Sequence, residues 1–392
     1  MKYHFAIISD LHLGVMDIER QKEELNDIFF RDIELLDPLD AIIVTGDTYD
    51  HKIYLNDKTT DLCIWFYQTL FQIAEEKHAK VRFVYGTKSH EADQYNLINR
   101  FTNMAINVKV IKTVEEEELF PGVFVLYLPE EHIFNKTKYY QEFLYDEECK
   151  NRYDYVFGHG VIDQVMKTGP SSKEEPKRLH VPSFSVGELL HACRGEVFFG
   201  HYHIHSDVKD RLHYVGSYNR WIYGEETPKG YMTAFYDMDE GTYESEFIEN
   251  VKALRLITLR YGFNHNIFKS SDSLLQELDK IERYISNDLA DGVRCIFNIP
   301  PDIENPEFVI HTINERFKFR SDIKTEITNG YVDEKRKINK EELQEVVDHY
   351  RFVLDKNLEI EDKLNQFIEL RKERSIGKEK VKKYLNEPLK IT

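Results

Sequence analysis

The chain has 392 residues, which suffices for two or three domains with sizeable cores, so a disulfide framework is unnecessary. Lysine and arginine number 52 against 70 aspartates and glutamates, and the net charge of −18 excludes bulk electrostatic attraction to nucleic acid. The cysteines are far apart and form no C-x-x-C pair, which favours buried thiols in a reducing compartment over a zinc or redox site.

The N-terminal residues MKYHFAIISD predict a first strand rather than a targeting segment. Their apolar part is too short for a signal peptide. No later apolar run approaches the roughly 18 residues of a membrane-spanning helix. We therefore expect a cytoplasmic protein without a membrane span.

Five short apolar runs in the first 250 residues predict buried strands. They alternate with amphipathic stretches, as in layered α/β proteins, and four of the five end in glycine. Helices are expected near 19–35 and 57–78. Residues 105–128 predict a further pair of strands around a turn, and 167–182 predict a polar loop near the site. The five runs are YHFAIIS, AIIVTG, VRFVYG, YDYVFG and GEVFFG.

The remaining sequence predicts two further parts. From Val251 the order strand, helix, strand, helix, strand indicates a small α/β module. From about Asn339 the chain is charged and helical with an apolar stripe, which packs either on its own protein or against a partner's helix or coiled coil. We expect three parts, residues 1–250, 251–330 and 331–392.

Five segments place carboxylate, hydroxyl or imidazole groups just beyond a predicted strand. Ligands gather outside the carboxyl ends of strands in open sheets, so these segments should converge on one crevice. Mixed carboxylates and imidazoles suit Mn²⁺, Fe²⁺ or Zn²⁺ better than Ca²⁺. Two cations about 3.5–4 Å apart, bridged by Asp47, would suit phosphoester hydrolysis. The segments are SDLH with Asp10 and His12, GDTYDH with Asp47, GTKSHE with Ser89 and His90, GHG with His159, and GHYHIH with His201, His203 and His205.

This order of motifs resembles the calcineurin-like metallophosphoesterase superfamily over residues 3–250, and GHYH is its most specific element. The resemblance implies an α/β sandwich of two mixed sheets flanked by helices, with two divalent cations, Mn²⁺ being the expected one. It also implies that His90 protonates the leaving oxygen or steadies the transition state. The implied ligands are Asp10, His12, Asp47 and His203 for one cation, and Asp47, Ser89, His159 and His201 for the other. His205 is either a further ligand or an orienting neighbour.

One motif departs from the family pattern. Where the family has G-N-H, this chain has GTKSHE, with two extra residues after Gly86 and Ser89 in the asparagine's place. Serine is shorter than asparagine, so the second cation would be bound more weakly, through a water, or by Thr87 instead.

Three features resemble the SbcD type, the nuclease subunit of the SbcCD and meiotic-recombination-eleven complexes. The stretch LHYVGSYNRWIYGEETPKGY is similar to a loop that meets DNA, residues 251–330 to a capping domain, and the helical tail 331–392 to the segment that grips an ABC-type ATPase. The resemblance implies a DNA exonuclease or endonuclease in repair, recombination or replication, an SbcC-like coiled-coil partner that uses the ATP, and a homodimer through helices near 57–78 and 93–103.

Basic and aromatic residues near the site are candidates for DNA contact. Their alternative roles are ordinary packing for the aromatics and a solvated surface for the cations. Two divalent cations add four charges to −18 and leave −14, so DNA should be held mainly by an assembly. The candidates are Arg178, Arg211, Tyr218, Arg220 and Lys229.

Two other functions remain open on the same motifs. Fold and metal site do not determine the substrate, so the chain could be a phosphoesterase for a small phosphodiester or a phosphoprotein. The change at Ser89 also allows a DNA-end assembly factor that has lost turnover.

Overall fold

The computed structural model describes most of the chain, in eight segments. The predicted loop 167–182 and helical tail 331–392 lie outside them. Two compact units are present, Met1–Phe297 with Asn305–Ile327, and Asn298–Glu304 with Thr328–Thr392, and the boundary expected near residue 250 stays a prediction. The described segments are residues 1–54, 57–101, 106–163, 183–209, 211–262, 265–300, 303 and 305–329.

The first sheet is mixed and has six strands. Parallel pairing joins β1, β2, β3 and β4, and the β13–β14 hairpin adds to β1 in antiparallel register, with Phe5 opposite Ala234. All five residues of β2 are buried, which accounts for its continuous apolar sequence. In sheet order the strands are β14 (Thr242–Glu249), β13 (Gly230–Asp237), β1 (Lys2–Ile8), β2 (Ala41–Thr45), β3 (Lys80–Val84) and β4 (Asn107–Ile111).

The second sheet is also mixed and has six strands. Its parallel centre consists of β12, β10, β7 and β6, and β11 and β5 pair antiparallel at the two edges. In sheet order the strands are β11 (Ser206–Asp207), β12 (Leu212–Tyr214), β10 (Cys193–Gly200), β7 (Tyr153–His159), β6 (Val123–Leu128) and β5 (Glu115–Phe120). The short strands β8 (Val161–Ile162) and β9 (Ser183–Phe184) pair separately.

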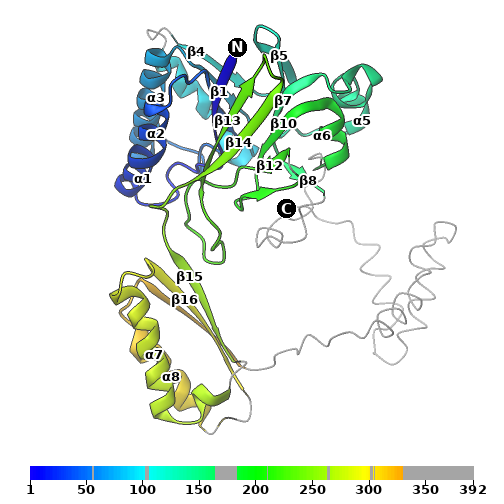
Figure 1. The fold of residues 1–392 in the computed structure, drawn as a ribbon. Helices are drawn as coiled ribbons and strands as arrows, with labels where there is room; N and C mark the ends of the chain where they lie inside the picture. Colours follow the sequence, from blue (N-terminus) through cyan, green and yellow to red (C-terminus); the bar gives the residue numbers. More distant parts are fainter. Residues whose placement is uncertain are drawn as a thin grey trace, which may run out of the picture. The chain divides into compact units, whose positions relative to one another are not determined.

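The two sheets pack against each other, with helices on both outer faces (Figure 1). Aromatic rings fill the space between the sheets, where Phe5 packs on Tyr155 with ring centroids 4.8 Å apart. The outer helices of the first sheet are α1 (Ile18–Glu24), a π-helical turn Leu25–Phe30, α2 (Arg31–Leu35) and α3 (Lys58–Lys77); those of the second are α5 (Lys136–Tyr139), the π-helical Gln141–Tyr145 and α6 (Val186–Ala192). The expected α/β class with two mixed, helix-flanked sheets is confirmed.

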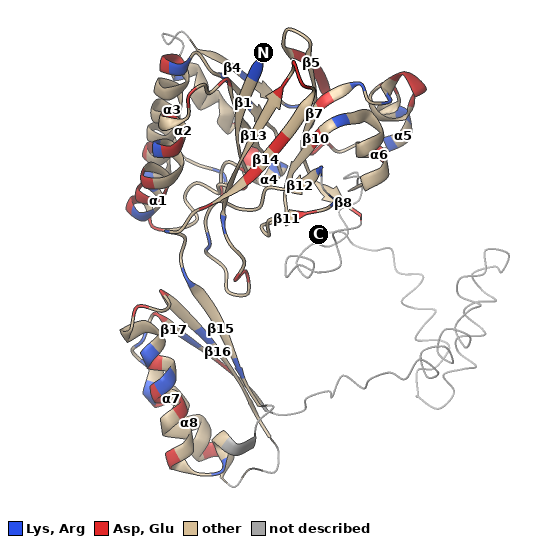
Figure 2. Cartoon of the chain, viewed as in Figure 1, with Lys and Arg blue, Asp and Glu red and all other residues tan. Residues whose placement is uncertain are grey.

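The order strand, helix, strand, helix, strand predicted from Val251 is confirmed, and the three strands form one sheet. Its strands lie in the order β15 (Leu256–Tyr261), β16 (Gly292–Ile299), β17 (Ile323–Asn329), and its helices are α7 (Ser271–Ser286) and α8 (Pro306–Phe317). The Ser270 hydroxyl accepts the Ser273 N–H and starts α7 with a capping box. Acidic and basic residues alternate along this helix (Figure 2).

The five predicted apolar strands and both predicted helical regions are confirmed. Residues 105–128 differ from expectation because they contain three strands, not two. β4 belongs to the first sheet, whereas β5 and β6 form a hairpin in the second, turning at Gly122 with φ of 79°. All four cysteines are buried thiols, as expected. Among the described residues, no helix is both long and apolar enough to cross a membrane.

Candidate metal centre

The predicted ligands converge because they follow the carboxyl ends of parallel strands in both sheets. Asp10 and Asp47 come two residues after β1 and β2 of the first sheet. In the second sheet, His159 ends β7, and His201 directly follows the end of β10. Register pairs Gly200 with His159, so these two strand ends lie side by side.

Glycines at the strand ends allow this close approach. A Cβ on Gly46 would lie 2.2 Å from His159 Nδ1, and one on Gly200 would lie 2.1 Å from Ser9 Oγ and 2.2 Å from Thr45 O. Such distances are far inside van der Waals contact, so no larger residue fits without displacing the ligands. The glycines at the strand ends therefore allow the two sheets to approach each other closely at this point.

Several ligand residues have backbone angles that are uncommon outside glycine. The φ angles are 46° at Asp10, 43° at His12, 48° at Asp47 and 103° at His201. Left-handed conformations of non-glycine residues carry strain, which the surrounding structure must hold, and they cluster at functional sites. Here they turn each strand end sharply, so that the following side chain faces the centre.

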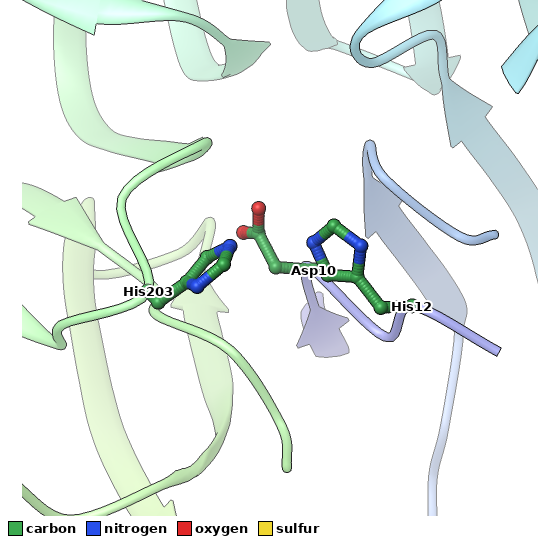
Figure 3. Close-up of side chains that lie close together, drawn as sticks. All are labelled: Asp10, His12 and His203. Carbon is green, nitrogen blue, oxygen red and sulfur yellow. The ribbon is translucent and has the colours of Figure 1, made fainter. Parts of the chain in front are cut away.

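The first group of ligands consists of Asp10, His12 and His203, whose ligand atoms lie within 4.8 Å of one another. Figure 3 shows the two imidazoles on either side of the Asp10 side chain. His203 Nδ1 donates to Glu225 Oε1 at 3.0 Å, which leaves Nε2 to face the group. His12 is buried, yet neither of its ring nitrogens makes a hydrogen bond.

Two further groups adjoin the first, Asp10 with Asp47 and His159, and Glu130 with His159 and His201. His159 Nδ1 donates to Thr45 O at 2.8 Å. Its buried Nε2 therefore faces Asp47 Oδ2 at 3.4 Å, without a hydrogen bond of acceptable geometry. Because Asp10 and His159 each belong to two groups, the three form one continuous centre.

The electrostatics of the centre favour ionised carboxylates. Burial by itself would raise the pKa of Asp47, but the neighbouring His159 holds that pKa well below its usual value. Burial lowers the pKa of His12 well below the ordinary range, so this imidazole is neutral. Burial opposes protonation of His159, yet the neighbouring Asp47 carboxylate raises its pKa to about 10. A cation bound beside the two side chains would be stabilised by the same carboxylate.

The donor set fits divalent transition-metal cations. Carboxylate oxygens and imidazole nitrogens are the ordinary ligands of these cations. The buried ring nitrogens of His12 and His159 make no hydrogen bond, and a bound cation would satisfy them. Two ligand atoms bound to one cation at roughly 2.1 Å lie about 3.0–3.5 Å apart. The 3.4 Å between His159 Nε2 and Asp47 Oδ2 has that spacing.

His90 lies beside the first group, as expected of a proton donor. It belongs to the short helix α4 (Lys88–Glu91), and its ring meets the ring of His12 edge-on with centroids 4.9 Å apart. The backbone carbonyl of Asp50 accepts from His90 Nδ1. From that contact we infer that Nδ1 carries a proton. Nε2 is then the ring nitrogen available to a substrate.

The expectation that Ser89 is a ligand is wrong. Of the two extra residues, Thr87 precedes helix α4 and Lys88 begins it, and Ser89 is exposed at the surface. Thr87 is buried in its place. Its N–H donates to Asp47 Oδ1 at 2.6 Å, and its hydroxyl donates to Glu130 Oε2 at 3.3 Å.

The direct DNA contacts expected of Tyr218, Arg220 and Lys229 are also corrected, because all three are buried. The Tyr218 hydroxyl donates to Glu24 O at 2.8 Å, and Arg220 Nε donates to Glu225 O at 2.7 Å. Lys229 Nζ donates to His203 O and to Glu225 Oε2. These side chains hold the loop that carries the metal ligands instead of presenting a surface.

Arg211, a further candidate for DNA contact, lies away from the centre. The Arg211 guanidinium donates to Arg194 O at 2.8 Å, at the start of β10. The candidate ligand His201 follows the opposite end of that strand, about 23 Å away at 3.3 Å per residue. Arg178 lies outside the described residues.

Three residues of the centre were missed by sequence reasoning. Glu130 follows β6 by two residues, the same spacing as Asp10 and Asp47 after their strands, and that spacing was a usable signal. Glu225 lies within the G-E stretch and orients His203. Trp221 packs on His12 and His203, with centroids 4.9 and 5.0 Å away, and covers one side of the first group.

His205 belongs to none of the three ligand groups found among the described residues. Its Nδ1 donates to Tyr214 O at 2.9 Å, and its ring stacks on Phe247 with centroids 4.0 Å apart. These contacts favour the second role considered for it, that of a neighbour which supports the ligand loop.

Comparison with known proteins assigns no family. No family model matches the chain, and no curated protein matches it. Solved structures do match, among them one chain 16% identical, for which the match covers 63% of this chain and 99% of that chain with a TM-score of 0.34. A likeness at that score supports no argument about fold family or activity, so function rests on the residues themselves.

Proposed function

We propose that this chain is a calcineurin-like metallophosphoesterase, acting as the two-metal DNA nuclease subunit of an SbcCD-like complex. The observation that carries the proposal is the continuous set of three ligand groups at the strand ends of both sheets. Asp10, His12 and His203 would hold one cation, and His159 and His201 the other. Asp47 lies between the two sets, with Oδ2 3.9 Å from His12 Nε2 and 3.4 Å from His159 Nε2.

When bound, two divalent cations, Mn²⁺ in our proposal, would supply a nucleophilic water and offset the charge that develops on the phosphate. The chain's own residues orient the reaction. His90 Nδ1 donates to the Asp50 carbonyl, so a ring that also carries a proton on Nε2 would hand that second proton to the leaving oxygen. Trp221 excludes water from one side of His12 and His203.

DNA as substrate is supported by sequence resemblance and by the layout of the chain. The G-E and K-G residues of the SbcD-like stretch are the pair Glu225 and Lys229, and both support His203 from behind. The module of β15–β17 with α7 and α8 has the predicted order of a capping domain. The proposed assignment to the SbcD type depends on the stretch with Glu225 and Lys229, on the small α/β module, and on the predicted helical tail.

The charge of the chain favours a partner in DNA binding. Two divalent cations would add four charges to −18 and leave −14. Acidic and basic residues are mixed along α1 and α3 (Figure 2). Because long-range attraction to a polyanion follows the summed charge, affinity for DNA would come mainly from an SbcC-like ATPase bound to this chain.

The test of the proposed function measures nucleotide release from linear duplex DNA by the full chain with Mn²⁺, with and without its ATPase partner. We expect release by the wild type and a loss of at least 100-fold for His90→Ala, since positioned proton transfer contributes about 10²–10⁴-fold. His311→Ala is the matched control, because His311 is exposed on α8.

Three outcomes distinguish the alternatives. DNA cleavage that is lost with His90→Ala supports the nuclease. Hydrolysis of an aryl phosphodiester without DNA cleavage would overturn it in favour of a small-substrate phosphoesterase. If neither substrate is cut with excess Mn²⁺ and partner, the chain is a non-catalytic assembly factor.

The partner is tested separately by co-purification. The full chain should retain an ATPase with long coiled coils, and a chain ending before Asn339 should lose it while still binding Mn²⁺. Retention by the shortened chain would refute the proposed role of the helical tail.

A further inference from the structure

The metal centre contains one carboxylate that no sequence motif supplies. The ligand atoms of Glu130, His159 and His201 lie within 4.8 Å of one another. Building on the function proposed above, we propose that Glu130 directly binds the second cation, completing a site with Asp47, His159 and His201. It would take the place expected of Ser89.

The backbone holds Glu130 firmly at the centre. Its N–H donates to the carbonyl of Tyr85 at 3.0 Å, which ties the end of β6 in the second sheet to the end of β3 in the first. The side chain is only 1% exposed.

The surrounding contacts hold the Glu130 carboxylate beside His159 and His201, the two imidazoles of its ligand group. Oε2 lies 3.7 Å from His201 Nδ1, close to the spacing of two ligands on one cation. The same oxygen accepts from the Thr87 hydroxyl, and the Thr87 N–H holds Asp47 Oδ1. Thr87 is therefore a positioning residue that fixes both carboxylates of the group.

An independent observation on His159 points to the same cation. Its Nε2 is buried without a hydrogen-bond partner. The bond from Nδ1 to Thr45 O fixes the ring, so Nε2 faces the group that includes Glu130. A buried nitrogen aimed at a carboxylate in this way is the arrangement of two ligands that share a cation.

A carboxylate at this position changes the charge of the loaded centre. Asp10, Asp47 and Glu130 contribute three negative charges, which two divalent cations turn into a net charge of +1. A neutral ligand in place of Glu130 would leave +2. The centre should hold its second cation more tightly and attract a phosphate less strongly than a centre with a neutral ligand.

The experiment counts Mn²⁺ ions and measures their affinities by titration calorimetry on the full chain. The wild type should bind two ions. Glu130→Ala should leave the affinity for the first ion unchanged and weaken the affinity for the second by at least about 10-fold. For the isosteric Glu130→Gln, the affinity for the second ion should lie between those of the wild type and Glu130→Ala. The control is Glu131→Gln, whose carboxylate accepts from Val114 N and from the Tyr139 hydroxyl and should leave both ions unchanged.

A second readout guards against misfolding. Without metal, Glu130→Gln should be at least as heat-stable as the wild type, because one buried negative charge beside Asp47 is gone, yet Mn²⁺ should raise its melting temperature less. Two ions bound with unchanged affinity in both Glu130 variants would overturn this inference and leave the nuclease proposal standing. A wild type that binds two ions but cuts no DNA would refute the nuclease proposal and leave the role of Glu130 intact, and one that binds none would refute both.

Discussion

The side chain of His203 is held from behind by a buried ion pair. His203 Nδ1 donates to Glu225 Oε1, and the other oxygen of Glu225 accepts from Lys229 Nζ at 2.9 Å. Burial would raise the pKa of Glu225, but His203 and Lys229 lower it to about 2, so the carboxylate stays ionised across the physiological range. Ionised Glu225 makes His203 Nε2 a more basic ligand.

Replacing Glu225 should therefore weaken the first cation without removing any direct ligand. We expect Glu225→Gln to lower Mn²⁺ affinity at the first group roughly 10–100-fold, the range observed for partners of metal-bound histidines. Titration calorimetry measures the change, with Glu240→Gln at an exposed turn as control. Unchanged affinity in a folded Glu225→Gln variant would show that this hydrogen bond does not tune the ligand.

At the level of single residues, the sequence predicts ligands whose identity and position are local. Asp10, His12 and His203 come directly after strands that their own segments reveal, and the structure brings them together. Ser89 failed because inserted residues can form a helical turn, and the sequence does not say which residue that turn exposes. Glu130 was missed because it belongs to no recognised motif, although it follows β6 at the same spacing as Asp10 and Asp47 follow their strands.

At the level of elements, one ion pair joins β3 of the first sheet to the edge strand β5 of the second. Arg82 on β3 is only 2% exposed, and its Nε and Nη2 donate to the two oxygens of Glu117 on β5 at 2.9 and 2.6 Å. The Tyr127 hydroxyl on β6 donates to the same carboxylate. The guanidinium has few other partners, chiefly backbone carbonyls such as Asn107 O.

We expect Glu117→Ala to destabilise the protein by about 3 kcal/mol, because it leaves a buried guanidinium without its counter-ion. Urea unfolding measures the loss, and the exposed Glu244→Ala on β14 should cost under about 1 kcal/mol. Burial alone would raise the pKa of Glu117. The hydrogen bonds and charge of Arg82 outweigh that effect and bring the pKa below its usual value. That stabilisation is present above the unfolded pKa and lost as pH falls through the folded one, so wild type and variant should converge in acid.

The strand-end glycine Gly200 is a second element-level test. A Cβ there would meet Ser9 Oγ and Thr45 O within 2.2 Å, so Gly200→Ala must separate the ends of β10 and β2. We expect a loss of about 1–3 kcal/mol in unfolding free energy and weaker Mn²⁺ binding. Gly187→Ala in α6 meets nothing nearer than 3.8 Å and should be neutral or stabilising. An equally benign Gly200→Ala would disprove the close approach.

Strand and helix predictions succeeded where the hydrophobic pattern alone decides the element. Buried strands such as β2 read as continuous apolar runs, and α7 has a clear capping signal. The hairpin of β13 and β14 gave a weaker signal because β14 is a half-exposed edge strand with alternating polar residues. The partners of a strand depend on long-range register, which is why residues 105–128 predict a single pair of strands although β4 lies in one sheet and β5 and β6 in the other.

At the level of the whole molecule, the candidate metal centre draws its residues from both sheets. Asp10 and Asp47 come from the first sheet, whereas His159 and His201 come from the second. Without cations, the carboxylates of the centre repel one another across this junction. A cation that binds only the folded chain must stabilise the whole sandwich through mass action.

Mn²⁺ should therefore raise the melting temperature of the full chain. At a free concentration about 100 times the dissociation constant, the gain is about 2.7 kcal/mol per site. At roughly 2–4 °C per kcal/mol for a domain of about 150–250 residues, the shift amounts to several degrees. A chelator should reverse it, and Asp47→Asn should reduce it most, because Asp47 faces ligands of both groups. A melting temperature indifferent to Mn²⁺ in the wild type would mean that the strand ends of the two sheets bind no cation.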